Sequence, residues 1–263
     1  MLGAIIGDIV GSRFEWNNIK RKSFEFFTPE CFATDDSIMT LAIAKAIMDS
    51  RPDHSDLGVC AVKAMQEVGR PYPGCGYGGM FMQWMYSDDP QPYNSFGNGA
   101  AMRVSPCGFA ATSLEEAKAL SRAATEVTHN HPEGIKGAEA TTVAIYMART
   151  GSALEEIRAE IDRHYYPMDF TLDGIRDDYT YDVTCQGTVP QALMAFFESD
   201  SFEDAIRNAI SLGGDSDTLA AITGGVAEAF YGIPDDIRRQ ATEYLDERLA
   251  SILKAFESAY PVK

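Results

Sequence analysis

The stretch Thr34-Asp35-Asp36-Ser37-Ile38-Met39-Thr40-Leu41 has a near-copy close to the other end of the chain, Asp215-Ser216-Asp217-Thr218-Leu219-Ala220-Ala221-Ile222. In each, hydroxyl and carboxylate side chains stand directly before an apolar helical run, and Thr34 suits a helix N-cap. Acidic residues are favoured at a helix start by the helix dipole, so one such cluster has a purely structural explanation. Two of them, roughly 180 residues apart, raise the question of whether they meet around a metal ion.

Helical signals recur along the rest of the chain. Two candidate capping boxes begin at Ser113 and Ser152. Few segments alternate with strand periodicity and no linker divides the chain, so the sequence predicts a compact, all-α single domain over residues 1–263. Residues 17–33, interpreted as a mobile flap, and 166–187 are expected to be irregular. Helices are predicted over 2–14, 34–48, 55–68, 78–86, 113–127, 133–149, 153–165, 188–198, 202–211, 217–230 and 235–258, with a short helix after Asn98.

The first predicted helix carries glycines at every fourth position, Gly3, Gly7 and Gly11. Glycines on one face let a second helix approach closely, so we expect this face to pack against another helix. Asp8 lies inside the apolar segment and needs buried partners. Glu15 follows beside Phe14 and Trp16, where an apolar environment can raise the pKa of a carboxyl group and suit it to carry protons.

The charge and cysteine content exclude several classes of protein. The net charge of −17 and the pI near 4.5 argue against nucleic-acid binding and against an anionic membrane surface. The five cysteines form no C-x-x-C pair, which indicates reduced thiols in a cytoplasmic protein. The N-terminus has the character of neither a signal peptide nor an anchor.

The two acidic stretches together offer only oxygen donors, which are the ligands that Mg²⁺ and, among softer ions, Mn²⁺ prefer. Four carboxylates in one pocket repel each other strongly without a cation, so a shared site requires one or two ions. The candidate metal ligands are Thr34, Asp35, Asp36, Asp215, Asp217 and Thr218.

Two further segments suggest ligand contacts. The run Ser95-Phe96-Gly97-Asn98-Gly99-Ala100-Ala101-Met102-Arg103 opens a short helix with two glycines around an asparagine, and its backbone N–H groups can face an anion. His129 and His131 stand two positions apart before Pro132. This spacing is a poor zinc signature, so structural or ligand-stacking roles are favoured for both histidines.

The chain resembles the ADP-ribosylglycohydrolases over nearly its whole length. The resemblance rests on Gly7-Asp8-Ile9-Val10-Gly11 with Glu15, on Thr34-Asp35-Asp36 and on Gly97-Asn98-Gly99-Ala100-Ala101-Met102-Arg103. It continues through Thr128-His129 and Gly213-Gly214-Asp215-Ser216-Asp217-Thr218. It implies an orthogonal helical bundle, most simply a monomer, with two Mg²⁺ or Mn²⁺ ions bound by the six ligands named above.

The resemblance also implies how a ligand binds. The ions would hold the hydroxyls of the distal ribose, Gly97-Asn98-Gly99 would hold the diphosphate, and His129 or His131 with Phe96 or a tyrosine would line the adenosine. The reaction would be hydrolysis of the bond from that ribose to an acceptor, with Glu15, Asp36 or Asp217 as the base. Arginine-directed bacterial members place an aspartate just before Gly-Asn-Gly, where this chain has Ser95.

The partner implied is an ADP-ribosylated protein, most simply one modified on arginine, or a small molecule that carries ADP-ribose. Serine-linked or small-molecule acceptors remain alternatives, as does a non-hydrolysing ADP-ribose binder. An all-α isoprenoid synthase, which also binds Mg²⁺ at Asp-rich helices, is disfavoured because no Asp-Asp-x-x-Asp pattern follows Asp35.

Overall fold

Helices form the regular structure of the protein, as the sequence predicts. The computed structural model describes residues 1–261, in which no strand occurs and β-pairing is limited to one bridge between Gly97 and Thr184. The elements are α1 (Leu2–Gly11), the short 3-10 helix η1 (Ser12–Phe14), α2 (Asp35–Asp49), α3 (Leu57–Gly69), α4 (Gly79–Met85), α5 (Gly99–Met102), α6 (Ser105–Ala110), α7 (Leu114–Thr125), α8 (Pro132–Arg149), α9 (Leu154–His164), α10 (Leu172–Ile175), α11 (Cys185–Phe197), α12 (Phe202–Ile210), α13 (Ser216–Tyr231), α14 (Asp235–Thr242) and α15 (Glu247–Ala259).

Helices α1 and α13 pack backbone to backbone, which confirms the role predicted for the glycine face. A Cβ atom on Gly3 would lie 2.2 Å from the Gly224 carbonyl oxygen, and one on Gly7 would lie 1.9 Å from that of Ala220. A Cβ on Gly11 would lie 2.5 Å from the Cα of Asp217. Because any larger residue would push the helices apart, this contact fixes the place of Asp217 relative to α1.

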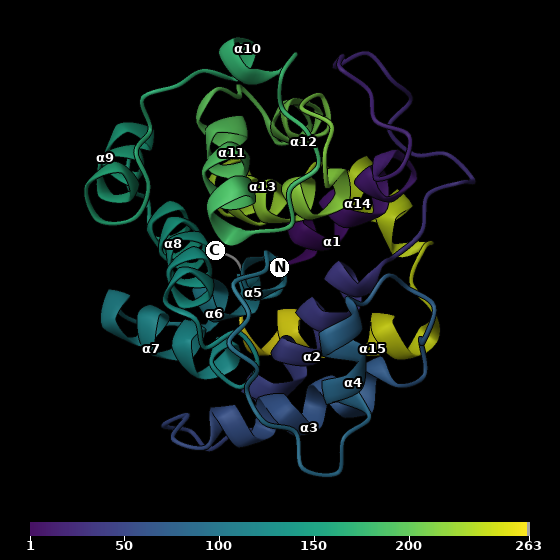
Figure 1. Ribbon diagram of the computed structural model, residues 1–263, viewed down its shortest axis with the longest axis vertical. Helices are drawn as coiled ribbons and strands as arrows, with labels where there is room; N and C mark the ends of the chain where they lie inside the picture. The colour runs from purple at the N-terminus through teal and green to yellow at the C-terminus, as the bar shows by residue number, and fades with distance from the viewer. Residues whose placement is uncertain (262–263) are drawn as a thin grey trace.

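The two long central helices are surrounded on most sides. Helix α13 contacts α1, α8, α11 and α12, whereas α2 packs against α3, α6 and α15. In Figure 1, α11, α12 and α13 occupy the upper half of the molecule, α2, α3 and α15 the lower half, and the short α5 the space between. The starts of α2 and α13 therefore belong to opposite halves of the bundle and face its centre.

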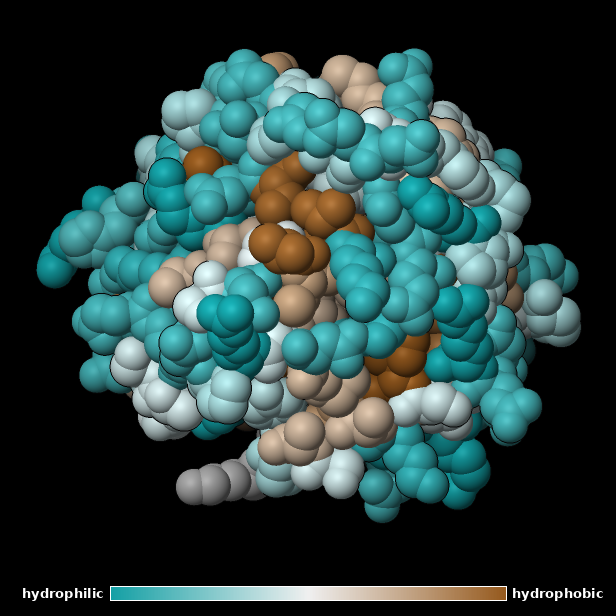
Figure 2. Space-filling view, turned by 90° about the horizontal axis from the view of Figure 1, so that it is seen from below, coloured by the Kyte–Doolittle hydropathy of each residue, from teal (hydrophilic) through white to brown (hydrophobic). Residues whose placement is uncertain are grey.

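The outer helices are amphipathic. In α3 the buried residues Leu57, Ala61, Ala64, Met65 and Val68 recur at helical spacing, and the opposite side faces solvent. The molecular face seen from below is accordingly hydrophilic over most of its area, with apolar residues gathered in a central band (Figure 2). Among residues 1–261 a bilayer-crossing helix is absent, since none combines the length with the hydropathy required.

The prediction of one continuous helix over 235–258 is wrong, because the segment forms two helices, α14 and α15. Asp246 lies between them and caps α15, where its carboxylate accepts the Leu249 N–H at 2.9 Å. It also accepts the Tyr72 hydroxyl at 2.6 Å. A capping aspartate inside a helical pattern is thus the local signal of the break.

Two other boundaries differ from prediction. The irregular segment 166–187 contains α10 and ends early, because Thr184 caps α11 by accepting the Gly187 N–H at 3.1 Å. Ala153, rather than Ser152, occupies the N-cap of α9, and the Glu156 carboxylate accepts its N–H at 2.9 Å. Helix α6, which begins at Ser105, was not predicted.

Residues 17–33 form an irregular segment, as expected, and side chains from distant elements hold it on the body of the protein. The Lys20 ammonium donates to the carbonyls of Arg176, Tyr179 and Leu212 at 2.6–2.7 Å. Arg207 donates to the carbonyls of Lys22 and Phe24. These contacts do not support the interpretation of the whole segment as a mobile flap.

Candidate active site

A cavity of about 640 Å³ lies where the starts of α2, α5 and α13 converge. Thr34 and His131 are the two predicted site residues that do not line it. The predicted residues that do are Glu15, Asp35, Asp36, Ser95, Phe96, Gly97, Asn98, Gly99, His129, Asp215, Asp217 and Thr218.

The start of α2 is built on a buried aspartate of α1. Thr34 caps the helix by accepting the Asp36 N–H, and its own hydroxyl donates to Asp8 at 2.6 Å. Asp8 also accepts the N–H of Thr34 and both the N–H and the hydroxyl of Ser37. Asp8 thus has the partners that its burial requires, and it aligns the first turn of α2.

The start of α13 is built differently. The side chain of its cap residue Asp215 makes no capping bond to the helix and instead accepts the Asn98 side-chain amide at 2.7 Å. Gly213 and Gly214 precede it with φ of 68° and 70°, which glycine adopts without strain. The Asn18 side chain holds this turn by donating to the Gly214 carbonyl and accepting its N–H, at 2.9 and 2.8 Å.

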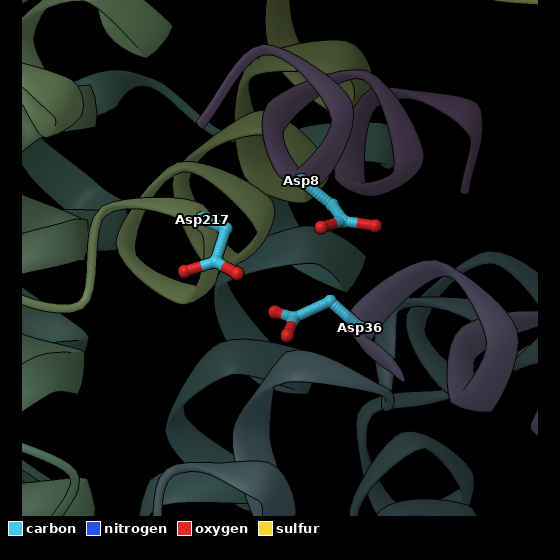
Figure 3. A group of neighbouring side chains, drawn as sticks. All are labelled: Asp8, Asp36 and Asp217. Atoms are coloured by element: carbon cyan, nitrogen blue, oxygen red, sulfur yellow. The ribbon is translucent and has the colours of Figure 1, made fainter. Parts of the chain in front are cut away.

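The two helix starts meet directly. The Thr218 hydroxyl of α13 donates to Asp36 of α2 at 3.2 Å. Asp8, Asp36 and Asp217 place carboxylate oxygens within 4.8 Å of one another, and Figure 3 shows the three side chains converging from three helices. Glu15, Asp215 and Asp217 form a second such group, so Asp217 belongs to both.

No salt bridge to these carboxylates occurs among the described residues, and their pKa values are raised. Burial, together with the charges of Asp8 and Asp215, raises the pKa of Asp35 to about 8. Burial and neighbouring carboxylates raise the pKa of Asp36 and Asp217 well above the usual range. The pKa of Glu15 is also raised, by burial and then by Asp215. The site is therefore costly to ionise as it stands.

The donor set fits a hard divalent cation. One oxygen of Asp36 and one of Asp217 are buried without a hydrogen-bond partner among the described residues. Such orphaned oxygens are rare in folded proteins, and a bound cation would satisfy them. The acidic cluster predicted from the sequence thus exists as a group that can hold metal.

Glu15 stands at the rim of the cavity beside two aromatic residues. The Tyr181 hydroxyl donates to the Glu15 carboxylate at 3.1 Å. Trp16 stacks on the Tyr181 ring with centroids 5.2 Å apart, and its side chain is 75% exposed. The rim therefore presents an open aromatic face next to a carboxylate.

The Gly97-Asn98-Gly99 segment lies across the cavity, with much of its hydrogen-bonding capacity used internally. The Gly97 N–H donates to the Ser95 hydroxyl at 3.1 Å, and the Asn98 N–H donates to the Val183 carbonyl at 2.7 Å. The Gly99 N–H has no partner among the described residues. Of the three amides, that of Gly99 is thus the one free to meet a ligand.

The two histidines have different surroundings. His129 is buried, and its ring lies 5.8 Å from that of Tyr93 on the cavity wall. His131 lies outside the lining residues and caps α8 by accepting the Glu133 N–H, with its ring 5.1 Å from Phe96. Between the two, His129 is the one in a position to contact a ligand.

The sequence argument missed several residues that shape the site: Trp16, Asn18, Tyr93, Arg103 and Tyr181. Arg103 stood inside a quoted segment, and its isolation in a small-residue run of an acidic chain was a usable signal. Tyr181 and Asn18 act across more than 160 positions of sequence, which no local pattern reveals.

The fold and site together define an all-helical protein with a buried, carboxylate-lined ligand cavity. The profile of the family described as ADP-ribosylglycohydrolase matches residues 1–261, and the chain belongs to this family. It is accordingly a hydrolase of glycosidic bonds.

Relatives carry related names. The chain is 24% identical to mouse ADP-ribosylhydrolase ARH3, over 89% of this chain and 83% of that protein. It is 28% identical to the ADP-ribosyl-[dinitrogen reductase] glycohydrolase of Rhodospirillum rubrum, over 77% of this chain and 70% of the relative. The match to ADP-ribosylarginine hydrolase Tri1 of Pseudomonas putida, also at 28% identity, covers 65% of this chain but 48% of that protein.

A solved structure titled ADP-ribosylglycohydrolase-related protein complex has the same fold. It superposes with a TM-score of 0.65 at 25% identity, over 97% of this chain and 95% of that one. These comparisons confirm the all-α architecture and the family resemblance predicted from the sequence.

Proposed function

We propose that the protein removes ADP-ribose from ADP-ribosylated arginine on proteins, using two Mg²⁺ or Mn²⁺ ions. The observation that carries the proposal is the cavity in which Asp35, Asp36, Asp215 and Asp217 converge, with two orphaned buried oxygens and Glu15 at the rim. Its volume of about 640 Å³ falls within the range of small-ligand sites.

The ions would be held by the carboxylates and hydroxyls of the two helix starts: Thr34, Asp35, Asp36, Asp215, Asp217 and Thr218. Asp217 belongs to both carboxylate groups and could therefore help to hold either ion. Thr34 contributes its oxygen only by giving up its bond to Asp8 or by sharing the atom. When bound, the ions would hold the ribose hydroxyls and polarise a water molecule.

Glu15 is the base that this geometry favours over Asp36 and Asp217. The oxygens of Asp36 and Asp217 lie deep in the site and suit metal ligation, whereas Glu15 is only half-buried. Burial and then the Asp215 charge raise the pKa of Glu15, which makes this carboxylate a stronger base than an ordinary surface glutamate. Tyr181 orients this carboxylate through its hydroxyl.

The aromatic rim supports arginine as the acceptor. A guanidinium group binds favourably to the face of a tryptophan and to a carboxylate, and Trp16 and Glu15 offer both side by side. Ser95 favours a second candidate, a serine-linked or small-molecule acceptor, because it supplies a hydroxyl where the family resemblance implies a carboxylate for an arginine-directed enzyme.

The test is release of ADP-ribose from two defined peptides, one arginine-linked and one serine-linked, each with Mg²⁺, with Mn²⁺ and with EDTA. We expect metal-dependent release from the arginine-linked peptide. Trp16→Leu should raise KM for that peptide, whereas Phe32→Leu, which alters an exposed aromatic residue outside the cavity, should not. Release from the serine-linked peptide alone would show that the acceptor is serine and not arginine. ADP-ribose binding without release from either peptide would indicate a non-hydrolysing binder.

A further inference from the structure

Arg103 is a buried cation on the cavity wall, and among the described residues no carboxylate pairs with it. Its side chain is 1% exposed, and it is the only lysine or arginine among the described residues that line the cavity. One terminal nitrogen donates to the Thr128 hydroxyl oxygen at 2.6 Å and to the Ala124 carbonyl at 3.4 Å. Burial lowers its pKa to about 10, which leaves it protonated at neutral pH.

Thr128 connects this guanidinium to His129. The Thr128 hydroxyl oxygen lies 2.7 Å from Nδ1 of His129 and 3.3 Å from the Thr125 carbonyl oxygen. That carbonyl already accepts two backbone N–H groups, from Thr128 at 3.1 Å and from His129 at 2.9 Å. Because a carbonyl oxygen has two lone pairs, the hydroxyl proton is directed to the other acceptor, His129 Nδ1.

The protonation of His129 follows from these contacts. Arg103 can only donate, so the Thr128 oxygen accepts from it and gives its own proton to Nδ1. A second ring proton is disfavoured, since burial and then the Arg103 charge lower the pKa of His129 well below its usual value. The remaining proton of the neutral imidazole therefore sits on Nε2.

Nε2 of His129 faces the Gly97-Asn98-Gly99 segment. A Cβ atom on Gly99 would lie 3.4 Å from Nε2, and one on Gly97 would lie 3.6 Å from it. Nε2 makes no hydrogen bond to the described residues. Nε2 of His129 thus lies near Gly99. The Nε2–H and the Gly99 N–H are two free hydrogen-bond donors on the part of the cavity wall that includes Arg103.

We propose that Arg103 and Thr128 are positioning residues that hold His129 as an Nε2–H donor, which binds a hydrogen-bond acceptor of the ligand next to the Gly99 amide. The acceptor is a phosphate oxygen or an adenine ring nitrogen, two groups that share this chemistry. The inference rests on the proposed function for the identity of the ligand but not for the state of the histidine.

The first test needs no activity. Long-range ¹H–¹⁵N NMR spectra of the full-length protein at pH 7 distinguish the two neutral imidazole tautomers and the imidazolium. We expect His129 to carry its proton on Nε2, with the other three histidines as internal references. A proton on Nδ1, or on both nitrogens, would overturn the proposal whether or not the protein is a hydrolase.

Substitutions at Thr128 then test the contacts. Thr128→Val removes the hydroxyl at nearly constant volume and should abolish the single Nε2–H state, whereas Thr128→Ser should retain it. Thr125→Val is the matched control, because the Thr125 hydroxyl is buried at the same helix end without a partner. If Thr128→Val does not fold, the wild-type and Thr128→Ser spectra still decide the question.

Binding of ADP and of adenosine, measured by ligand-observed NMR, identifies the acceptor. Losing one donor should weaken binding by about tenfold in Thr128→Val. Weaker binding of ADP alone assigns the contact to a phosphate oxygen, and an equal loss for both ligands assigns it to the adenine. Unchanged affinity for both, together with a lost tautomer, would contradict the proposal.

Discussion

The starts of α2 and α13 share a pattern of hydroxyl and carboxylate residues before an apolar run, but different contacts give them their shape. At α2, Thr34 caps its own helix and a buried aspartate from α1 fixes the first turn. At α13, the cap residue Asp215 bonds to a side chain of another segment, Asn98, and two glycines with positive φ set the approach of the chain.

This difference distinguishes residues that cap a helix from residues that form the site. Capping explains Thr34 fully, and Asp35 and Asp36 are not needed for it. At α13 the carboxylates serve no capping purpose, since the Asp215 side chain makes no capping bond and one Asp217 oxygen has no partner among the described residues. Residues that a helix does not need, brought together from two helices, are the strongest structural mark of function in this molecule.

The largest expected effect tests whether both starts serve one site. Asp35→Ala and Asp217→Ala should each lower turnover by at least about 100-fold, because each removes a charge that the ions require. Helical content, measured by circular dichroism, should stay near that of the parent. Asp49→Asn, at an exposed ion pair with Lys45, is the control. Near-normal activity in either alanine variant would leave its helix start without a catalytic role.

The next effect concerns the repulsion between the two starts. The folded pKa of Asp35 is raised from 3.8 to about 8, so the folded state binds more protons than the unfolded state between these values. In EDTA, the contribution of Asp35 to stability should therefore be fully present below pH 3.8 and be lost as pH rises toward 8. Mg²⁺ or Mn²⁺ at 100 times its Kd should restore about 2.7 kcal/mol.

Calorimetric Tm values at several pH values between 5 and 8, with EDTA and with Mn²⁺, measure this difference. The pH slope should be steep in EDTA and shallow with metal. An equal slope under both conditions would show that the carboxylates are not neutralised by the ion.

The smallest expected effect compares how much Asp8, at the start of α2, and Asn18, at the start of α13, contribute to stability. Asp8→Asn should destabilise the protein by about 1–3 kcal/mol, because an amide nitrogen would face the donors of Thr34 and Ser37 in a buried place. Asn18→Ala should cost about 1 kcal/mol, since its bonds to Gly214 lie nearer the surface. Urea unfolding measures both, with the exposed Asn17→Ala as control, and the reverse order would refute this account of the two starts.

The fold was predictable to the extent that its signals are local. Helix periodicity, the Thr34 cap and the glycine face of α1 each depend on a few adjacent turns, and all three were found from the sequence. The break at Asp246 was also local but was hidden by helical periodicity on both sides.

The sequence pointed to the acidic residues of the cavity, to its Gly97-Asn98-Gly99 wall and to His129, but not to the contacts that support them. The repeated acidic cluster marks Asp36 and Asp217 as unusual in the sequence. The fold then brings the two side chains together. The bonds from Tyr181 to Glu15 and from Asn18 to Gly214 depend on loop conformations, which tertiary contacts decide. The roles of Arg103 and Thr128 depend on which charges and hydrogen-bond acceptors surround them in the folded protein, and a local sequence pattern does not reveal those neighbours.

The glycine contact between α1 and α13 has a consequence for how this protein can diverge. Since backbone meets backbone at Gly3 and Gly7, the spacing of the two helices depends on no side chain that could change its rotamer. The rim, by contrast, comes from Trp16 and Tyr181, which lie in irregular segments outside the helices. Loop exchange at the rim should therefore redirect the enzyme to new acceptors while the catalytic platform keeps its dimensions, and directed evolution of specificity is best confined there.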